Sequence, residues 1–462
     1  MLTYALKGGR SPALYDQLYR CIKNDILCGR LCADEKLPSK RSLAEHLKVS
    51  VVTIESAYAQ LVAEGYVYSL EKRGYYVSPL EQSVPPEPPA EFLPDEAESA
   101  PCFLDLRTNR IDPQFFPFSV WSKITRSVLS RQDVGLLNPI PYNGVLELRK
   151  AIAEYLYRFR GIEVAPVQIV IGAGTEYLYG LLVQLLGRNR MYAVEDPGYP
   201  KIRHVYSANG VAYCGLPLDE EGVCTGALRK SGAEIVHLSP SHHFPTGIVT
   251  SIGRRRELLN WAMEQPGRYI IEDDYDSEFR FSGRPIPTLQ SIDHSERVIY
   301  MNSFSKTIAP SIRISYMILP PHLAKRLRED FGFYSCTVSG FEQYTLAEFI
   351  QSGHFESHIS RMKKLYRERR NRMIALIQAS PLAGRSAIYE KDAGLHFLLH
   401  LDTGRSDADL SRAAENAGIR LAFMKDYQMH PTELYQHTVI VNYSGMDIGR
   451  FSEALSVLAQ LL

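Results

Sequence analysis

A stretch of proline and acidic residues divides this chain into two parts of unequal length. Residues 79–101 hold seven prolines, six Asp or Glu residues and no Lys or Arg. A segment of that composition buries too little apolar surface to form a core, so we expect an extended linker. Since structureless loops beyond about 15 residues are uncommon inside compact domains, residues 1–78 and 102–462 are predicted to be separate domains.

The composition excludes several classes of protein. Among 462 residues, 45% are hydrophobic, and 52 basic residues balance 52 acidic ones, which excludes a disordered chain and one that is basic throughout. The sequence has no apolar signal region at its start and no apolar run of about 18 residues, so we expect neither a secretory signal nor a membrane span. The seven scattered cysteines favour reduced thiols in a cytoplasmic protein. Cys21, Cys28 and Cys32 lack a partner group at zinc spacing, and no metal site is predicted there.

The first 78 residues predict three helices followed by a small hairpin. Apolar residues recur every three or four positions within residues 14–26 and 54–62, which is the period of an amphipathic helix. Ser39 is placed to cap a short second helix. Residues 66–68 and 75–77 are rich in Tyr and Val and flank Lys72-Arg73-Gly74, a pattern that predicts a β-wing.

Helices in this order form a module that reads DNA. The second helix of a helix-turn-helix pair enters the major groove with its first residues, here Ser50, Val51, Val52 and Thr53. The basic wing tip suits contact with phosphates or the minor groove. Residues 1–78 contain 11 Lys or Arg and 8 Asp or Glu, a mild basic surplus that by itself leaves open a small helical accessory domain.

Individual residues point further toward DNA. Leu-Pro-Ser-x-Arg-x-Leu-Ala at 37–44, Val-Ser at 49–50, Glu-Gly at 64–65 and Gly-Tyr-Tyr-Val at 74–77 resemble the GntR-type winged helix. The resemblance implies binding to double-stranded DNA. The expected DNA-binding residues are Ser39, Arg41, Ser50, Thr53, Lys72 and Arg73. The family usually carries Arg where this chain has Val51, which removes one charge-assisted contact.

The larger part alternates between apolar strand candidates and helical stretches. The candidates span residues 169–171, 191–195, 235–238, 269–271, 298–301 and 314–319. This α/β alternation predicts parallel strands in a doubly wound sheet with helices on both faces.

Lysine 306 follows one of these strands in Asn302-Ser303-Phe304-Ser305-Lys306. A lysine in a partly buried pocket can lose its proton and form a Schiff base with an aldehyde. Ser303 and Arg313 are placed to hold a phosphate near it, and Arg is the stronger anchor because it is bidentate and always charged. The Ser-x-x-Lys pattern alone carries little weight, because most such lysines are solvated.

Further pieces suit a pyridine cofactor. Asp273 and Tyr275 lie two apart at a strand end and can face one side; a carboxylate there keeps a pyridine nitrogen protonated, although an acidic surface turn is an equal alternative. Gly174 and Thr175 open a helix, where backbone N–H groups bind phosphate. Tyr199 follows a Pro-Gly turn and can lay its ring on a flat ligand.

The order of these motifs resembles the fold-type I aminotransferases over residues 102–462. Tyr142-Asn143-Gly144 and Ala393-Gly394-Leu395-His396 extend the resemblance. It implies the PLP-dependent transferase fold type I, with a mostly parallel doubly wound sheet and a smaller α/β domain, and pyridoxal 5'-phosphate as cofactor. By resemblance, Lys306 carries the internal aldimine, Asp273 pairs with the ring nitrogen, Tyr275 meets the phenolic oxygen and Tyr199 stacks. The residues implied for the phosphate are Gly174, Thr175, Ser303 and Arg313.

A GntR-type winged helix joined to such a domain is similar to the MocR family of bacterial transcription regulators. The resemblance implies a head-to-tail homodimer that binds DNA and a small-molecule effector. The chain departs from this pattern around the substrate. Aminotransferases usually place Asn before Pro-Thr-Gly, where this chain has Phe244, and they carry a carboxylate-binding Arg where it has Ile440. Lys201 stands where an Arg is expected in the γ-aminobutyrate-sensing relative, and Lys binds a carboxylate only as a point charge.

Three hypotheses follow. The first is a regulator that senses, through Lys306, either pyridoxal 5'-phosphate itself or an unusual amine such as a D-amino acid or a dipeptide. The second is a working aminotransferase with an accessory DNA-binding domain. The third is a DNA-binding protein whose larger domain only dimerises. His242 and His243 lack a third ligand of suitable spacing, so a metal centre is not expected.

Overall fold

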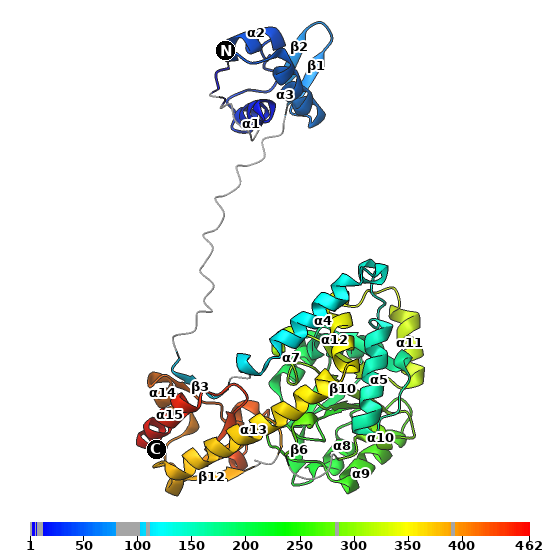
Figure 1. Cartoon of the computed structure of the whole chain (residues 1–462), viewed down its shortest axis with the longest axis vertical. Helices are drawn as coiled ribbons and strands as arrows, with labels where there is room; N and C mark the ends of the chain where they lie inside the picture. Colours follow the sequence, from blue (N-terminus) through cyan, green and yellow to red (C-terminus); the bar gives the residue numbers. More distant parts are fainter. Residues whose placement is uncertain are drawn as a thin grey trace. The chain divides into compact units, whose positions relative to one another are not determined.

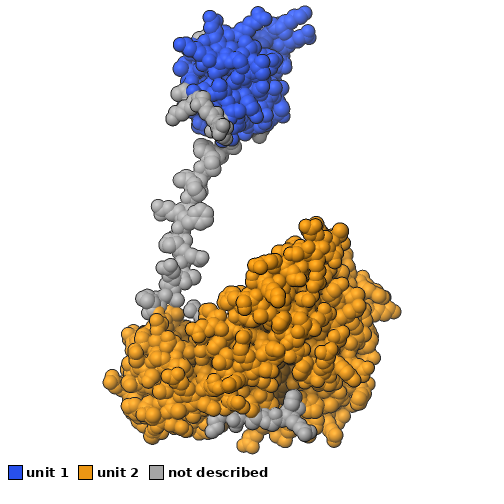
Figure 2. Space-filling model, viewed as in Figure 1, with its two compact units in different colours: residues 1–99 blue, residues 100–462 orange. Residues whose placement is uncertain are grey.

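The computed structural model describes residues 2–4, 6, 13–79, 102–107, 111–281, 286–389 and 393–462. The chain divides into two compact units, residues 1–99 and 100–462, which Figure 2 shows in different colours. From residue 80 onward, the linker predicted for residues 79–101 lies outside the described residues. No helix within the described ranges is long and apolar enough to span a bilayer.

The first unit has the three helices and the hairpin that the sequence predicts (Figure 1). Its elements are α1 (Leu14–Leu27), α2 (Lys40–Leu47), α3 (Val51–Ala63), β1 (Val67–Leu70) and β2 (Gly74–Val77). Ser39 caps α2 by accepting a hydrogen bond from the Ser42 amide at 3.2 Å, and Ser50 caps α3 through the Thr53 amide at 3.1 Å. These caps satisfy N–H groups that have no partner within the helix. The two serines therefore fix where the paired helices begin.

An eight-stranded sheet forms the centre of the second unit. Its order is β4 (Ile169–Gly172), β11 (Ser315–Ile318), β10 (Val298–Ser303), β9 (Tyr269–Asp273), β8 (Ile235–Leu238), β5 (Tyr192–Asp196), β6 (Tyr213–Asp219) and β7 (Gly222–Val223). All six predicted strands are present, whereas the sequence interpretation missed β6 and β7. Strands β10, β9, β8, β5 and β6 run parallel to one another.

The expectation of parallel strands is wrong for β11. This strand runs antiparallel to both β10 and β4. The segment that joins β10 to β11 contains a short 3-10 turn, η5 (Pro310–Ile312), and no α-helix, and a parallel crossover needs a longer connection. The same segment carries Lys306, so the lysine lies in the connection that reverses the chain at the carboxyl end of β10.

Helices cover both faces of the sheet. Alternate residues of β4 face opposite sides, since Ile169 and Ile171 pack in one apolar cluster and Val170 in another. The helices of this unit are α4 (Phe118–Ser130), α5 (Leu146–Arg160), α6 (Thr175–Leu186), α7 (Pro200–Ala208), α8 (Thr225–Lys230), α9 (Ile252–Met263), α10 (Leu289–Ile292), α11 (Pro321–Phe331), α12 (Gly340–Gln351), α13 (His354–Ala379), α14 (Asp407–Asn416) and α15 (Ile448–Leu461). The burial of both faces explains why the strands read as continuous apolar runs.

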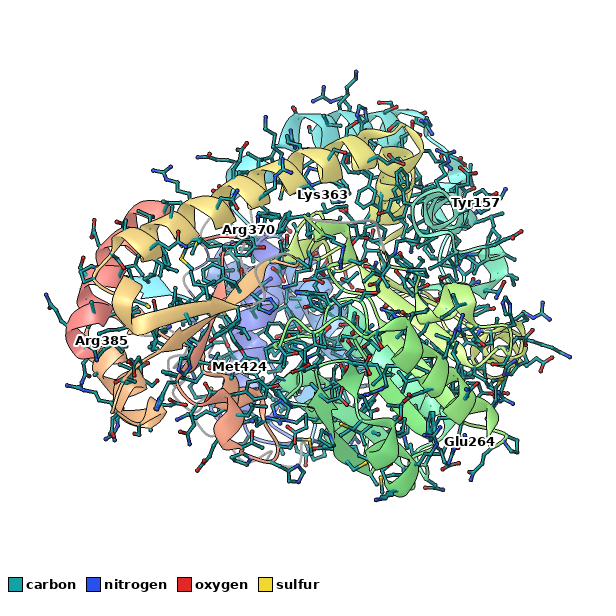
Figure 3. All side chains as sticks on the ribbon, turned by 90° about the horizontal axis from the view of Figure 1, so that it is seen from below. Tyr157, Glu264, Lys363, Arg370, Arg385 and Met424 are labelled. Carbon is teal, nitrogen blue, oxygen red and sulfur yellow. The ribbon has the colours of Figure 1, made fainter. Side chains whose placement is uncertain are left out.

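A smaller α/β domain follows the long helix α13. Its antiparallel sheet has the order β12 (Ser386–Tyr389), β13 (His396–Leu401), β15 (Thr438–Asn442), and β14 (Ile419–Arg420) pairs in parallel with β3 (Leu104–Asp105). In Figures 1 and 3, α13 extends along the unit, and Figure 3 labels Lys363 and Arg370 on it. This arrangement matches the predicted fold class, a doubly wound sheet with a smaller α/β domain.

Candidate functional site

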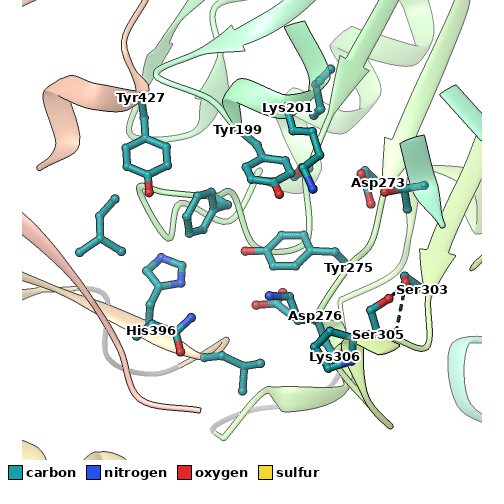
Figure 4. Close-up of a pocket in the computed structure, with 18 of the residues that line it drawn as sticks. Tyr199, Lys201, Asp273, Tyr275, Asp276, Ser303, Ser305, Lys306, His396 and Tyr427 are labelled. Carbon is teal, nitrogen blue, oxygen red and sulfur yellow. Dashed lines mark hydrogen bonds between the residues drawn. The ribbon is translucent and has the colours of Figure 1, made fainter. Parts of the chain in front are cut away.

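A cavity of about 350 Å³ lies where the carboxyl ends of the parallel strands meet the small domain. Parallel sheets bind ligands at this edge. Figure 4 shows Tyr199, Asp273, Tyr275, Ser303 and Lys306 around it. Further residues that line it include Thr175, Glu176, Tyr179, Lys201, Phe244, Asp276, Arg313, His396, Tyr427 and Ile440. The structure thus brings to one cavity every predicted cofactor residue except Gly174, which adjoins it through Thr175.

Lys306 presents an amine with altered acidity. Burial lowers the pKa of Lys306 to about 8; the carboxylate of Asp276 opposes this shift, and the ammonium of Lys201 adds to it. Burial disfavours the charged form of a lysine. About a tenth of this amine is therefore neutral, and thus nucleophilic, at pH 7, which is far more than for an ordinary lysine.

Asp273 ends β9 with one oxygen satisfied and one without a partner. Tyr179 donates its hydroxyl proton to Oδ2, and the Nε2 atom of His237 lies 3.7 Å from the same oxygen. Oδ1 is buried and has no hydrogen-bond partner within the described part of the chain. Leaving a buried acceptor unpaired costs about 1–3 kcal/mol. The carboxylate is therefore prepared for a donor that a ligand brings.

Two tyrosines and a phenylalanine line the next part of the cavity. Tyr199 is 40% exposed, and its ring meets Phe244 edge to face with centroids 5.8 Å apart. Phe244 also meets Tyr275 edge to face at 6.4 Å. Burial and then the carboxylates of Asp276 and Asp273 raise the pKa of Tyr275 well above its ordinary value. Its phenol therefore stays protonated and remains a hydrogen-bond donor.

An anion cradle lies at the start of α6. Gly174 precedes the helix with φ of 95°, and a Cβ atom there would come within 2.2 Å of an Arg313 nitrogen. Arg313 has φ of 52°, and its guanidinium donates to the carbonyl of Ala173, beside Gly174, at 3.2 Å. Helix N-termini and guanidinium groups both attract phosphate. Ser303 adds a hydroxyl, which accepts from the Ser305 amide at 3.1 Å.

Glu176 joins the cradle to Lys201. Its carboxylate accepts from Arg313 at 2.9 Å and from Lys201 at 2.8 Å. Burial alone would raise the pKa of Glu176, but the bonds from Lys201 and Arg313 lower it to about 2. The acid therefore stays charged, and Lys201 does not face the cavity as an unpaired cation.

The outer wall of the cavity is largely apolar. Ile440 on β15 is 3% exposed and lines the cavity at the position where an Arg was expected. Phe244, Leu395, Ala422 and Tyr427 continue this wall. Arg107 lies at the cavity as well, and its Nε pairs with Asp105 at 3.1 Å. The cavity therefore combines a polar cofactor end with an apolar outer end.

The predicted DNA-binding residues occupy two places in the first unit. Ser50 and Thr53 lie at the start of α3, joined by a hydroxyl contact of 2.8 Å, beside Val51 and Val52, which are 43% and 69% exposed. Lys72 and Arg73 lie exposed at the hairpin turn between β1 and β2. Arg41 is exposed on α2, directly after the capping Ser39 and Lys40. These are positions that a ligand can reach from outside.

Comparison with known proteins identifies both units. The family model for aminotransferase class I and II matches residues 105–439, and that for bacterial regulatory proteins of the gntR family matches residues 14–77. The HTH-type transcriptional regulator YdeL of Bacillus subtilis (strain 168) is 39% identical, over 96% of this chain and 96% of its own length. The probable rhizopine catabolism regulatory protein MocR of Rhizobium meliloti is 31% identical, over 96% of this chain and 93% of its own.

The chain belongs to the MocR-type transcription regulators. Its larger unit belongs to the class I and II aminotransferase family. Kynurenine aminotransferase of Pyrococcus horikoshii superposes with a TM-score of 0.68 at 23% identity, covering 79% of this chain and 91% of its own. That likeness shows a shared fold.

The donor set of this MocR-type chain fits pyridoxal 5'-phosphate. The unpaired Oδ1 of Asp273 suits a protonated ring nitrogen, and Gly174 leaves room for a phosphate beside Arg313. Lys306 supplies an amine whose pKa of about 8 suits reaction with an aldehyde. A metal is a poorer fit, because the described residues contain no group of three or more His, Cys, Asp or Glu that could hold one.

Sequence interpretation missed several residues of the site in this MocR-type chain. Tyr179 lies one helical turn after Thr175, and this spacing was the available signal for its contact with Asp273. Asp276 directly follows Tyr275, and His242 was weighed only as a metal ligand. The two are paired at 3.0 Å, a contact between segments 34 residues apart that no local pattern encodes.

Proposed function

We propose that this MocR-type chain is a DNA-binding transcription regulator that binds pyridoxal 5'-phosphate at Lys306. It responds either to that cofactor itself or to an amine that enters the same cavity. The observation that carries the proposal is the buried, unpaired Oδ1 of Asp273 in one cavity with Lys306. A carboxylate in that state is stabilised when a protonated ring nitrogen arrives.

Each residue has a distinct task in this proposal. The bound cofactor supplies an aldehyde that condenses with a primary amine and a ring that withdraws electrons. Asp273 holds the proton on the ring nitrogen, and Tyr179 orients Asp273 through its hydroxyl. Arg313, Ser303 and the start of α6 at Gly174 and Thr175 hold the phosphate.

The outer wall supports an effector other than a simple α-amino acid. A carboxylate is best held by the bidentate fork of Arg, and the corresponding place is taken by the buried Ile440. Lys201 is already paired with Glu176 at 2.8 Å, so a carboxylate would have to displace an existing ion pair. We therefore propose the cofactor itself, or an amine with an apolar flank, as the signal.

Catalytic transamination is the second candidate. Lys306, Asp273 and Arg313 would serve it equally well. Phe244 supplies no hydrogen-bond donor where aminotransferases have Asn, and Ile440 supplies no carboxylate anchor. We propose at most residual turnover, which an assay for keto-acid formation with common amino donors measures directly.

Double-stranded DNA is the proposed partner of the first unit. Ser50 and Thr53 begin α3, the helix expected in the major groove, and Lys72 and Arg73 form the wing tip. We propose that the chain forms a homodimer, head-to-tail as the family resemblance implies. Large apolar side chains near α4 support an interface between two copies: Phe118 is 64% exposed, Val134 71% and Leu137 81%. Sedimentation equilibrium of the full chain at twice the monomer mass would support it, and monomer mass would contradict it.

The decisive experiment is absorption spectroscopy of the full chain with added pyridoxal 5'-phosphate. We expect a visible band, a borohydride-trapped adduct on Lys306 by mass spectrometry, and loss of both in Lys306→Ala. Lys363→Ala is the matched control, because burial also lowers the pKa of Lys363, which does not line the cavity. A colourless wild-type protein without an adduct would contradict the proposal. DNA footprinting with and without the cofactor then separates the regulator from the enzyme.

A further inference from the structure

A buried histidine and aspartate lie next to the cavity tyrosine. His242 is 4% exposed and Asp276 is 2% exposed. The Nδ1 atom of His242 lies 3.0 Å and 3.2 Å from the two carboxylate oxygens, and 3.3 Å from the hydroxyl of Tyr275. Figure 4 shows Asp276 near Tyr275 and Lys306. The imidazole therefore links the carboxylate to the phenol.

The chemistry of the pair fixes the direction of a proton. An ionised carboxylate only accepts hydrogen bonds, so Nδ1 of His242 must carry the proton that joins it to Asp276. A protonated Nδ1 cannot accept a bond from Tyr275. The hydroxyl oxygen of Tyr275 can then only accept from His242. Its own proton is left for the Asp276 carboxylate, which also hydrogen-bonds this phenol, or for a ligand that enters the cavity. Tyr275 lines the cavity, so a ligand that binds there can compete with Asp276 for this proton.

The small domain holds this pair in place. Gly394 has φ of 72°, and a Cβ atom there would come within 2.0 Å of Cε1 of His242 and 2.8 Å of an Asp276 oxygen. The Gly394 amide donates to Phe279 at 3.1 Å, and Tyr443 donates its hydroxyl to the Gly394 carbonyl at 2.5 Å. The backbone of Gly394 is thus anchored against His242 and Asp276, which leaves the imidazole little room to rotate.

We propose that Asp276 and His242 are positioning residues that aim the Tyr275 hydroxyl at the phenolic oxygen of the cofactor. This inference rests on the proposed cofactor site. It also bears on the aromatic residue at 244: because Phe244 offers no donor, Tyr275 is the donor proposed for the phenolic oxygen of the cofactor among the described residues.

Other charged groups act on the same phenol. Asp273 and Asp276 face it from the end of β9, Glu195 from β5, and His242 from the segment after β8. Burial raises the pKa of Glu195 to about 8, so this acid is largely neutral at pH 7. Lys306 lies near Asp276. These charged groups are the same in the wild type and in a His242 variant. A shift seen only when His242 is replaced therefore reflects the orientation of the Tyr275 hydroxyl.

The test is a pH titration of the visible band in the full chain loaded with pyridoxal 5'-phosphate. In the loaded protein, the phenolic oxygen of the cofactor and the Lys306 nitrogen joined to the cofactor share one proton. A hydrogen bond donated to that oxygen lowers the affinity of the nitrogen for this proton. His242→Phe removes the N–H group that holds the Tyr275 hydroxyl. We expect the midpoint pH of the band to rise by about one to two units, which is the equivalent of one hydrogen bond to a charged group. His242→Asn keeps an N–H group near the Nδ1 position and should restore the wild-type midpoint.

A double-mutant cycle tests whether His242 acts through Tyr275 or disturbs the cavity in general. Tyr275→Phe should raise the midpoint by a similar amount, and His242→Phe should add nothing in that background. His437→Asn is the matched control, because His437 pairs with Asp407 at 2.9 Å outside the cavity. His242→Leu is a second donor-free variant should the Phe variant not fold.

Two results would overturn the inference. One is a wild-type midpoint in a folded, donor-free His242 variant; the other is an equal shift whether or not Tyr275 retains its hydroxyl. A wild-type chain that shows no band at all would instead contradict the proposed cofactor site, so the two failures are distinguishable.

Discussion

The two units present opposite kinds of surface to their proposed ligands. The first offers exposed residues at two places. Val52 at the start of α3 is 69% exposed, and Lys72 at the wing tip is exposed as well. The second offers buried groups that already have defined partners, such as Asp273 with Tyr179. Exposed charges act additively and weakly, whereas buried polar groups act through geometry. Single substitutions should therefore be mild in the first unit and severe in the second.

The largest effect should come from Gly174→Ala. A Cβ atom would lie 2.2 Å from Arg313 and would force a residue with φ of 95° into strain. Loss of the phosphate contacts and the added strain, together about 3 kcal/mol, should weaken cofactor binding by about 100-fold. Titration with pyridoxal 5'-phosphate measures this. A Cβ atom at Gly226 would meet open space, so Gly226→Ala should leave the affinity for the cofactor unchanged. Equal losses of affinity in both variants would contradict the prediction.

The second prediction concerns pH. The pKa of Lys306 is lowered to about 8, so the neutral amine increases as pH rises towards 8 and saturates above it. The rate of cofactor uptake by the free chain should rise about tenfold from pH 6 to 7 and level off above pH 8. Asp276→Asn removes the charge that opposes the shift, so the plateau should begin at lower pH. A rate still rising at pH 10 would indicate an ordinary exposed lysine.

The smallest effects should appear at the DNA-binding face. Lys72→Ala and Arg41→Ala should each weaken DNA binding by about 3–10-fold and reduce the salt slope by about one phosphate contact. The cofactor band should be unchanged in both. Arg20→Ala on α1 is the control, since Arg20 pairs with Asp16 and is not among the expected DNA contacts. Loss of the band together with DNA binding would show that the two units do not act as separate domains.

The same contrast explains what the sequence could predict. The first unit spans 64 consecutive residues, 14–77, in the family match, and its caps at Ser39 and Ser50 are local signals, so all five elements could be predicted. In the second unit, the alternation of apolar runs with helical stretches predicted the sheet, and the order of the motifs predicted the residues around Lys306. The reversal of β11 had a signal that was overlooked, because the segment that joins it to β10 is too short for a parallel crossover. The His242–Asp276 pair could not be predicted, because it depends on a contact between segments 34 residues apart.

Glu176 gives the two ends of the cavity a shared counterion. It contacts both Arg313 and Lys201, so a phosphate that binds Arg313 leaves the carboxylate to Lys201 alone. The charge of Lys201 is then neutralised more completely while a phosphate occupies the cradle. Through this one carboxylate, a phosphate at Arg313 sets the charge that a second anion meets at Lys201.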